Sequence, residues 1–184
     1  MIPEDLTDES LMLAYGKGDL RSFEMLYGRH KGPLYRFILR QCSNSSVAEE
    51  LYQDVWARLI KARETYQVSA KFTTWLYQIA QNRLIDHYRK ESTGKSANHS
   101  SSGLDELPAT EKEQPDIQAD YREKMTKLLR EIEKLPESQK QAFLLKQEAG
   151  LSVAEIAKVM GINDETAKSR LRYAVQKLRS QIND

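Results

Sequence analysis

The sequence predicts an all-α protein of two small helical domains, an N-terminal helical bundle and a C-terminal helix-turn-helix domain, joined by a flexible linker. In both halves apolar residues recur every three or four positions, which is the period of a helix, and an alternating strand pattern is almost absent. Helix-breaking residues are scarce, with 8 Gly and 5 Pro in 184 residues. One polar stretch separates the halves, and a chain of this length holds one domain or two small ones.

The N-terminal bundle is predicted to span residues 1–91 and to contain four or so helices. Residues 6–15 and 22–42 show a helical pattern, with glycines and Pro33 as breaks or kinks. Another long helix is expected over 73–90. The clearest amphipathic helix between them has a strict i, i+4 stripe formed by Val47, Leu51, Val55 and Leu59.

The predicted linker covers residues 92–116 and is rich in Ser, Thr, Gly, Asn, Pro and charged residues. It has almost no large apolar side chain, so it cannot bury enough surface to offset the entropy lost on ordering. A coil of about 25 residues averages roughly 25–30 Å from end to end and extends to about 80 Å. The two domains can therefore reach well-separated sites.

The C-terminal domain is predicted to span residues 117–184. Two helices end before Pro136 and Gly150, and Ser152 with Glu155 forms a capping box that opens a short helix. After a glycine turn, the last helix has apolar positions at Ala167, Leu171, Ala174, Val175, Leu178 and Ile182. A short helix, a glycine turn and a long basic helix are typical of a helix-turn-helix.

Charge is unevenly distributed along the chain. The total is 28 Lys and Arg against 27 Asp and Glu, a net charge of +1, but residues 121–184 hold 13 basic and 9 acidic side chains. Residues 166–179 contain five basic side chains and no acidic one, which indicates a surface that meets phosphates. The near-neutral total predicts weak DNA binding by the free chain.

Several classes of protein are excluded. Cys42 is the single cysteine, so no internal disulfide forms and a reducing cytoplasm is expected. An acidic start and the lack of a long apolar run argue against export or membrane insertion. Three scattered histidines and the absence of nucleotide-binding, zinc-protease or hydrolase motifs predict no catalytic residue, no metal and no cofactor.

The start of the last helix is predicted to read duplex DNA. Arg and Lys side chains donate hydrogen bonds to guanine edges and to phosphates, and Ser and Thr can bond to base edges or to phosphates. A Glu side chain can accept a hydrogen bond from a cytosine amino group. The alternative is a helical hairpin with a solvated basic face. The candidate residues are Glu165, Thr166, Lys168, Ser169, Arg170 and Arg172.

A second candidate surface combines aromatic and basic side chains in the N-terminal half. Such a surface suits single-stranded DNA, because bases stack on the rings while cations meet the phosphates. The alternative is that Phe72 and Trp75 are ordinary core residues. The candidate strand-capture residues are Tyr66, Lys71, Phe72, Trp75, Asn82, Arg83, Asp86 and Arg89.

Three segments together resemble the extracytoplasmic-function (ECF) sigma factors of bacteria, which are part of the sigma-70 family. They are AEELYQDVW at 48–56, FTTWLYQIAQNRLIDHYRK at 72–90, and LSVAEIAKVMGINDETAKSRLRYAVQKLR at 151–179. The resemblance covers nearly the whole chain apart from the linker. It implies a factor that binds core RNA polymerase, recognises promoter DNA and helps to open it, without a catalytic act of its own.

The resemblance also implies roles for particular residues. Residues 1–91 correspond to sigma domain 2, in which the strand-capture residues contact the −10 element. Residues 117–184 correspond to sigma domain 4, in which the helix-turn-helix reads the −35 element. Many family members have GTVKSR where this chain has ETAKSR at 165–170, so the base preference there is open. The residues implied to contact the clamp helices of the largest polymerase subunit are Leu51, Gln53, Asp54 and Trp56.

Two other functions stay open at this point. One is a stand-alone helix-turn-helix repressor or activator, which would bind duplex DNA tightly without polymerase. The other is an interaction module that sequesters regulators, in which truncation of Lys168 and Arg170 would leave activity unchanged. The resemblance further implies an anti-sigma factor as a partner.

Overall fold

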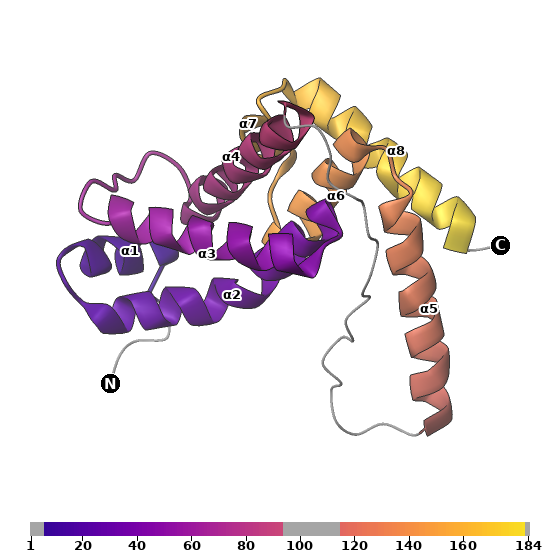
Figure 1. Ribbon diagram of the computed structural model, residues 1–184, viewed down its shortest axis with the longest axis horizontal. Coiled ribbons are helices and arrows are strands. Elements are labelled where there is room, and N and C mark those ends of the chain that lie inside the picture. Colours follow the sequence, from indigo (N-terminus) through magenta and orange to yellow (C-terminus); the bar gives the residue numbers. More distant parts are fainter. Residues whose placement is uncertain (1–5, 94–114, 183–184) are drawn as a thin grey trace.

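The computed structural model describes residues 6–93 and 115–182, with side chains described from residue 120 in the second range. These two ranges contain only α helices and no strand, which confirms the predicted all-α class (Figure 1). The helices are α1 (Asp8–Gly16), α2 (Leu20–Cys42), α3 (Ser45–Ala62), α4 (Phe72–Thr93), α5 (Pro115–Glu133), α6 (Glu137–Ala149), α7 (Val153–Met160) and α8 (Asp164–Ile182).

Helices α1 to α4 form the N-terminal bundle. Thr7, Asp19 and Asn44 cap α1, α2 and α3, because each side-chain oxygen accepts a hydrogen bond from a backbone N–H in the first turn. Helix α2 continues through Pro33, where the sequence indicated a break or kink. The core of the bundle includes Leu26, Leu34, Phe37, Ile38, Leu51, Val55, Leu59, Leu76 and Tyr77.

Gly16, at the end of α1, allows a close approach to the start of the α3–α4 loop. A Cβ at this position would lie 2.5 Å from the carbonyl oxygen of Arg63. Gly16→Ala is therefore expected to lower the free energy of unfolding by about 1–3 kcal/mol through overpacking. Urea unfolding followed by tryptophan fluorescence measures this change.

Gly28→Ala is the matched control for this prediction. Gly28 lies inside α2, and no atom comes within 4 Å of the position a Cβ would take. Because alanine favours helix over glycine by up to about 1 kcal/mol, this variant should be as stable as the original chain or slightly more stable. Equal destabilisation by the two substitutions would contradict the assigned close contact at Gly16.

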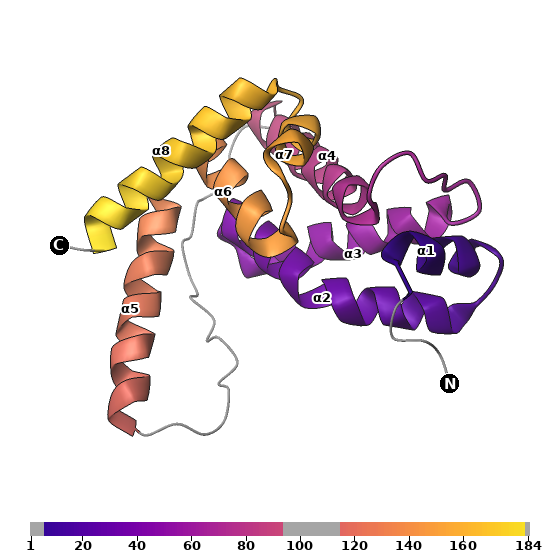
Figure 2. The ribbon, with the colours of Figure 1, turned by 180° about the vertical axis from the view of Figure 1, so that it is seen from behind.

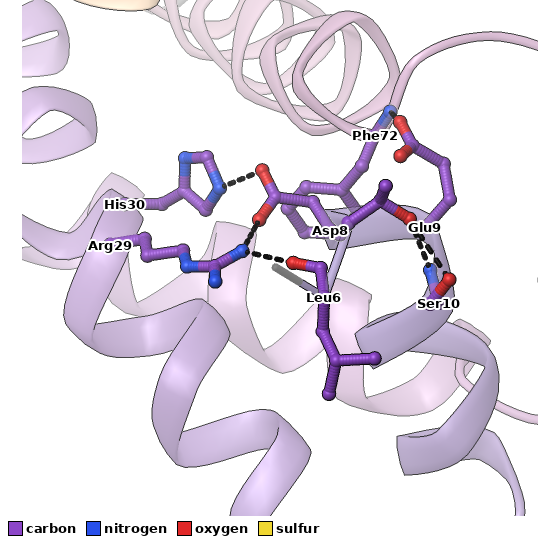
Figure 3. A network of polar contacts seen from close by, with 8 residues as sticks. Leu6, Asp8, Glu9, Ser10, Arg29, His30 and Phe72 are labelled. Atoms are coloured by element: carbon purple, nitrogen blue, oxygen red, sulfur yellow. Dashed lines mark hydrogen bonds and ion pairs between the residues drawn. The ribbon is translucent and has the colours of Figure 1, made fainter. Parts of the chain in front are cut away.

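A polar network joins the start of α1 to α2 and α4 (Figure 3). The carboxylate of Asp8 accepts hydrogen bonds from Arg29 at 2.8 Å and pairs with His30 Nε2 at 2.7 Å. Arg29 also donates to the carbonyl of Leu6 at 2.9 Å. Glu9 Oε1 accepts the backbone N–H of Phe72 at 2.6 Å and so caps the first turn of α4. A side chain from α1 therefore fixes the start of α4.

Asp8 makes part of the stability of the bundle dependent on pH. Burial raises the pKa of Asp8, but hydrogen bonds from His30 and Arg29 outweigh burial and hold the pKa below its usual value. A lowered carboxyl pKa stabilises the fold above the unfolded-state value, and this stabilisation is lost as the pH falls through the folded-state value. Asp8→Asn should lower the free energy of unfolding at pH 7 by about 1–3 kcal/mol.

The same substitution should make stability less sensitive to acid. Urea unfolding at pH 7 and pH 3 measures both effects, and Glu24→Gln on the exposed side of α2 is the control. An Asp8→Asn variant that keeps the original stability at pH 7 would show that the pairs of Asp8 with Arg29 and His30 contribute nothing to the fold.

Helices α5 to α8 form the C-terminal half. The predicted capping box is confirmed, since Ser152 Oγ accepts from the backbone of Glu155 while the Glu155 carboxylate accepts from the backbone of Ser152. Gly161 follows α7 with a φ of 66°, a left-handed conformation that favours glycine. Helix α5 packs against α8, and its N-terminal end stands away from the other helices (Figure 1).

The two halves touch each other. Helix α6 packs against α2 and α7 packs against α4, and both views show α6 and α7 between the N-terminal bundle and α8 (Figures 1 and 2). The predicted linker lies largely at 94–114, outside the described residues, and its two ends are helical because α4 continues to Thr93 and α5 begins at Pro115. Among the described residues, no helix is long and apolar enough to cross a membrane.

Candidate nucleic-acid and polymerase interfaces

The N-terminal end of α8 presents most of the predicted duplex-reading residues to solvent. Asn163 Oδ1 accepts the backbone N–H of Thr166 at 2.8 Å and caps the helix, while Ala167 is buried and fixes its rotation. This arrangement can place side chains of the first turns in a major groove. Glu165, Lys168 and Arg172 are exposed, and Thr166, Ser169 and Arg170 are half-buried.

The predicted strand-capture residues of α4 separate into two groups. Asn82 and Arg89 are exposed and Asp86 is half-buried, so these three side chains form an accessible face at helical spacing. Arg83 is only 9% exposed. It pairs with Asp54 of α3 and lies 3.5 Å from Asp86, so it ties α3 to α4 and orients the edge of the accessible face.

The aromatic side chains predicted for strand capture do lie together, but most of them belong to the hydrophobic core. Tyr66 and Trp75 rings lie 4.8 Å apart, and Phe72 and Trp75 rings lie 5.9 Å apart. Phe72 and Tyr66 are buried, and burial, together with the nearby carboxylates of Glu9 and Asp8, raises the pKa of Tyr66 to about 12. Trp75 is half-buried and offers the accessible edge of the cluster.

The α3–α4 loop adds groups that face solvent next to this cluster. Lys71 has 71% of its side chain exposed, and Val68 is 54% exposed. Val68 was not singled out from the sequence, because a lone apolar residue in a short loop carries no periodic signal. An exposed apolar side chain and a cation in the same loop are chemically suited to contact an unstacked base and its phosphate.

The four predicted polymerase contacts on α3 also fall into two groups, buried and accessible. Leu51 and Trp56 are buried in the bundle, and Asp54 is half-buried and paired with Arg83. Only Gln53 of the four is exposed. The exposed face of α3 continues through residues that the sequence reasoning did not select, although they lie off the apolar stripe: Glu49, Glu50, Ala57 and Ile60.

A metal site is not supported in the part of the chain that the structure describes. No group of three or more His, Cys, Asp or Glu side chains there is arranged to hold a metal ion. Cys42 is a free thiol, and burial raises its pKa.

Two family matches agree with the division into two helical halves. Sigma-70 region 2 matches residues 26–93, and Sigma-70 region 4 matches residues 125–178. The chain belongs to the ECF group of the sigma-70 family. Its function is that of an alternative sigma factor, which directs transcription initiation. Sigma factors are DNA-binding regulators and not catalysts.

Relatives match along nearly their whole length. The ECF RNA polymerase sigma factor SigW of Bacillus subtilis is 27% identical over 173 residues, which is 91% of this chain and 92% of SigW. The ECF RNA polymerase sigma-E factor of Escherichia coli is 27% identical over 188 residues, with 97% and 96% covered.

Two solved structures share the fold of this ECF sigma factor. One is the sigma factor RpoE in complex with the anti-sigma factor NepR from Bartonella quintana, with a TM-score of 0.69 and 20% identity over 89% of this chain and 98% of that chain. The other is CnrH in complex with the cytosolic domain of CnrY, with a TM-score of 0.67 and 19% identity over 96% and 97%.

Proposed function

We propose that the chain binds core RNA polymerase in the cytoplasm and directs it to promoters with two elements, without catalysing a reaction itself. In this proposal α8 reads a −35 element as duplex, and α4 with the preceding loop captures one strand of a −10 element. The observation that carries the proposal is the pair of accessible surfaces on separate halves, the Lys168 end of α8 and the Asn82–Arg89 face of α4.

The two surfaces suit two states of DNA. A helix in the major groove distinguishes base pairs while the duplex is closed. The Trp75 edge, Lys71 and the Asn82 face can hold bases only after they leave the stack, so binding favours the melted strand. Two modest contacts on one chain gain avidity when their spacing fits both elements.

Helix α3 supplies the proposed polymerase contact. Gln53 and the partly exposed carboxylate of Asp54 lie on its accessible side, and Asp54 can share its charge between Arg83 and a polymerase cation. The solved structure of RpoE bound to the anti-sigma factor NepR supports an anti-sigma partner for this chain as well. The four-residue contact set predicted from sequence remains a prediction.

Run-off transcription tests the proposal. Purified core polymerase, the chain and a library of promoter fragments are combined, and the transcripts are sequenced. We expect defined start sites that require the chain, and their shared upstream sequences should reveal both elements. Asn82→Ala should reduce initiation at these sites, while Lys90→Ala, at an exposed position nearby, should reduce it less.

A failure of the chain to direct polymerase would contradict the proposed function. If polymerase gains no specificity from the chain while the chain alone binds duplex DNA tightly, a stand-alone regulator replaces the proposed function. Loss of start sites on Asn82→Ala together with unchanged binding to core polymerase would separate DNA capture from polymerase docking.

A further inference from the structure

Helix α1 contacts both ends of the loop that joins α3 to α4, residues 63–71 (Figures 1 and 2). At the start of the loop, Gly16 lies so close to Arg63 that a Cβ on the glycine would be 2.5 Å from the Arg63 carbonyl oxygen. At the end of the loop, Glu9 Oε1 accepts the backbone N–H of Phe72 at 2.6 Å. A helix of nine residues therefore holds this loop at both ends.

The contact from Glu9 is a helix cap supplied by another helix. The first N–H groups of a helix have no partner within it, and the other three helices of the bundle are capped by the residue that precedes them. Lys71 precedes α4, and its ammonium group only donates hydrogen bonds, so it cannot cap the helix. The carboxylate that accepts the Phe72 N–H comes from 63 positions earlier in the chain. The start of α4 therefore depends on α1.

The residues around Glu9 hold it in place (Figure 3). Asp8, the preceding residue, is paired with Arg29 and His30 of α2, and these pairs anchor the first turn of α1. The His30 ring centre lies 5.2 Å from the Phe72 ring centre, so the same histidine also packs against the start of α4. Glu9 is half-buried, and its carboxylate is already in position in the free chain.

The segment held in this way carries side chains proposed to capture a melted strand. Trp75 lies about one helical turn after Phe72, and the two ring centres are 5.9 Å apart. The ring centre of Tyr66, which is buried, lies 4.8 Å from that of Trp75. The accessible edge of Trp75 therefore takes its position from the two rings packed against it, and one of these belongs to the residue that Glu9 caps.

We infer that Glu9 is a positioning residue for strand capture. By capping α4 from α1, it holds the α3–α4 loop and the edge of Trp75 in the arrangement that receives unstacked bases. The carboxylate acts through the Phe72 N–H and not through a base. The inference rests on the proposed function, in which α4 and this loop capture the −10 strand.

Charge and position predict opposite effects for the loss of Glu9. A carboxylate near DNA repels phosphates, so removal of its charge alone should strengthen DNA binding. Loss of the cap leaves the first turn of α4 free to fray, so strand capture should weaken. The sign of the change in affinity therefore distinguishes the two effects.

Three substitutions separate the reach of the side chain from its charge. Glu9→Asp keeps the charge but shortens the side chain by one methylene, about 1.5 Å, so the carboxylate no longer reaches the Phe72 N–H. Glu9→Gln removes the charge but keeps an acceptor oxygen at the same reach. Glu9→Ala removes both. We expect the Asp and Ala variants to lose the cap and the Gln variant to keep most of it.

Hydrogen exchange tests the cap in the full free chain, without polymerase or DNA. Exchange of the Phe72 amide, followed by nuclear magnetic resonance, should become about ten-fold faster in Glu9→Ala and Glu9→Asp. In Glu9→Gln it should stay within about three-fold of the original rate. Glu24→Ala removes the same charge from the exposed side of α2 and should leave this amide unchanged. Unchanged exchange in Glu9→Ala would overturn the cap.

Strand capture is measured with the polymerase complex. The probe is a fluorescent single-stranded oligonucleotide with the −10 sequence recovered by run-off transcription. Glu9→Ala and Glu9→Asp should bind it about five- to ten-fold more weakly, as expected for loss of a helix cap, and Glu9→Gln should bind almost as well as the original chain. Binding to core polymerase and to a closed duplex with the −35 element should not change. A bundle that is merely destabilised would weaken all three kinds of binding, and urea unfolding verifies that each variant is folded under the assay conditions.

The failure of this inference differs from the failure of the proposed function. If the original chain directs initiation and Glu9→Ala captures the strand equally well or better, Glu9 has no positioning role. If Glu9→Gln loses as much affinity as Glu9→Ala, the charge decides and not the reach, and the inference is again wrong. If the original chain itself gives no start sites, the proposed function fails and the role in strand capture fails with it.

Discussion

Leu51→Ala is expected to lower the free energy of unfolding of the α1–α4 bundle by about 2–5 kcal/mol, because Leu51 is almost completely buried and truncation leaves a cavity. Urea unfolding followed by tryptophan fluorescence measures this loss. Both tryptophans of the chain, Trp56 and Trp75, lie in the bundle, so the signal reports on this half alone.

The matched variant is Gln53→Ala, two positions along the same helix. Gln53 is exposed, so its truncation should change stability by no more than about 0.5 kcal/mol. If α3 docks on polymerase, this variant weakens binding to core enzyme while the bundle stays intact. Loss of polymerase binding by Leu51→Ala at unchanged stability would instead make Leu51 a direct contact and contradict its position in the core.

Arg170→Ala is expected to weaken promoter binding by the polymerase complex about 5- to 150-fold, which corresponds to about 1–3 kcal/mol for one base contact, and to relax the preference at one position of the −35 element. Lys168 is exposed, and Lys168→Ala should weaken binding more evenly across sequences and reduce the salt dependence. Binding is measured on a library of −35 variants at several salt concentrations.

Lys177→Ala is the control for both substitutions. It removes the same charge from an exposed position further along α8 and should leave sequence preference unchanged. Equal losses for all three variants would mean that α8 contributes only general positive charge. The proposed reading of the −35 element would then be wrong.

Local signals in the sequence were sufficient for the helices of the C-terminal half. The capping box at Ser152 and Glu155 and the turn at Gly161 are contacts within a few residues, so residue type and spacing determine them directly. The apolar stripe through Leu51, Val55 and Leu59 likewise identified the covered side of α3, and all three residues are buried.

The candidate site was harder to predict because its geometry depends on distant partners. Aromatic rings beside basic residues suit either a core or a stacking surface, and packing among α1, α2 and α4 buries Phe72. Arg83 has the chemistry of a DNA contact, yet Asp54, 29 positions earlier, holds it within the bundle. No periodicity in the sequence encodes such pairs, and Glu148 with Arg36 is a further example.

The polar network at Asp8 and Glu9 also bears on synthesis of the chain. Every contact that closes the N-terminal bundle, including the one from Glu9 to the start of α4, lies within the first 93 residues. We expect this half to fold on the ribosome before α6 has emerged, since domains fold as units in the order of their synthesis. Until Glu148 leaves the exit tunnel, Arg36 and Arg40 lack their carboxylate partner on α6, so an acidic chaperone or partner surface can bind both guanidinium groups during this interval without competing with Glu148.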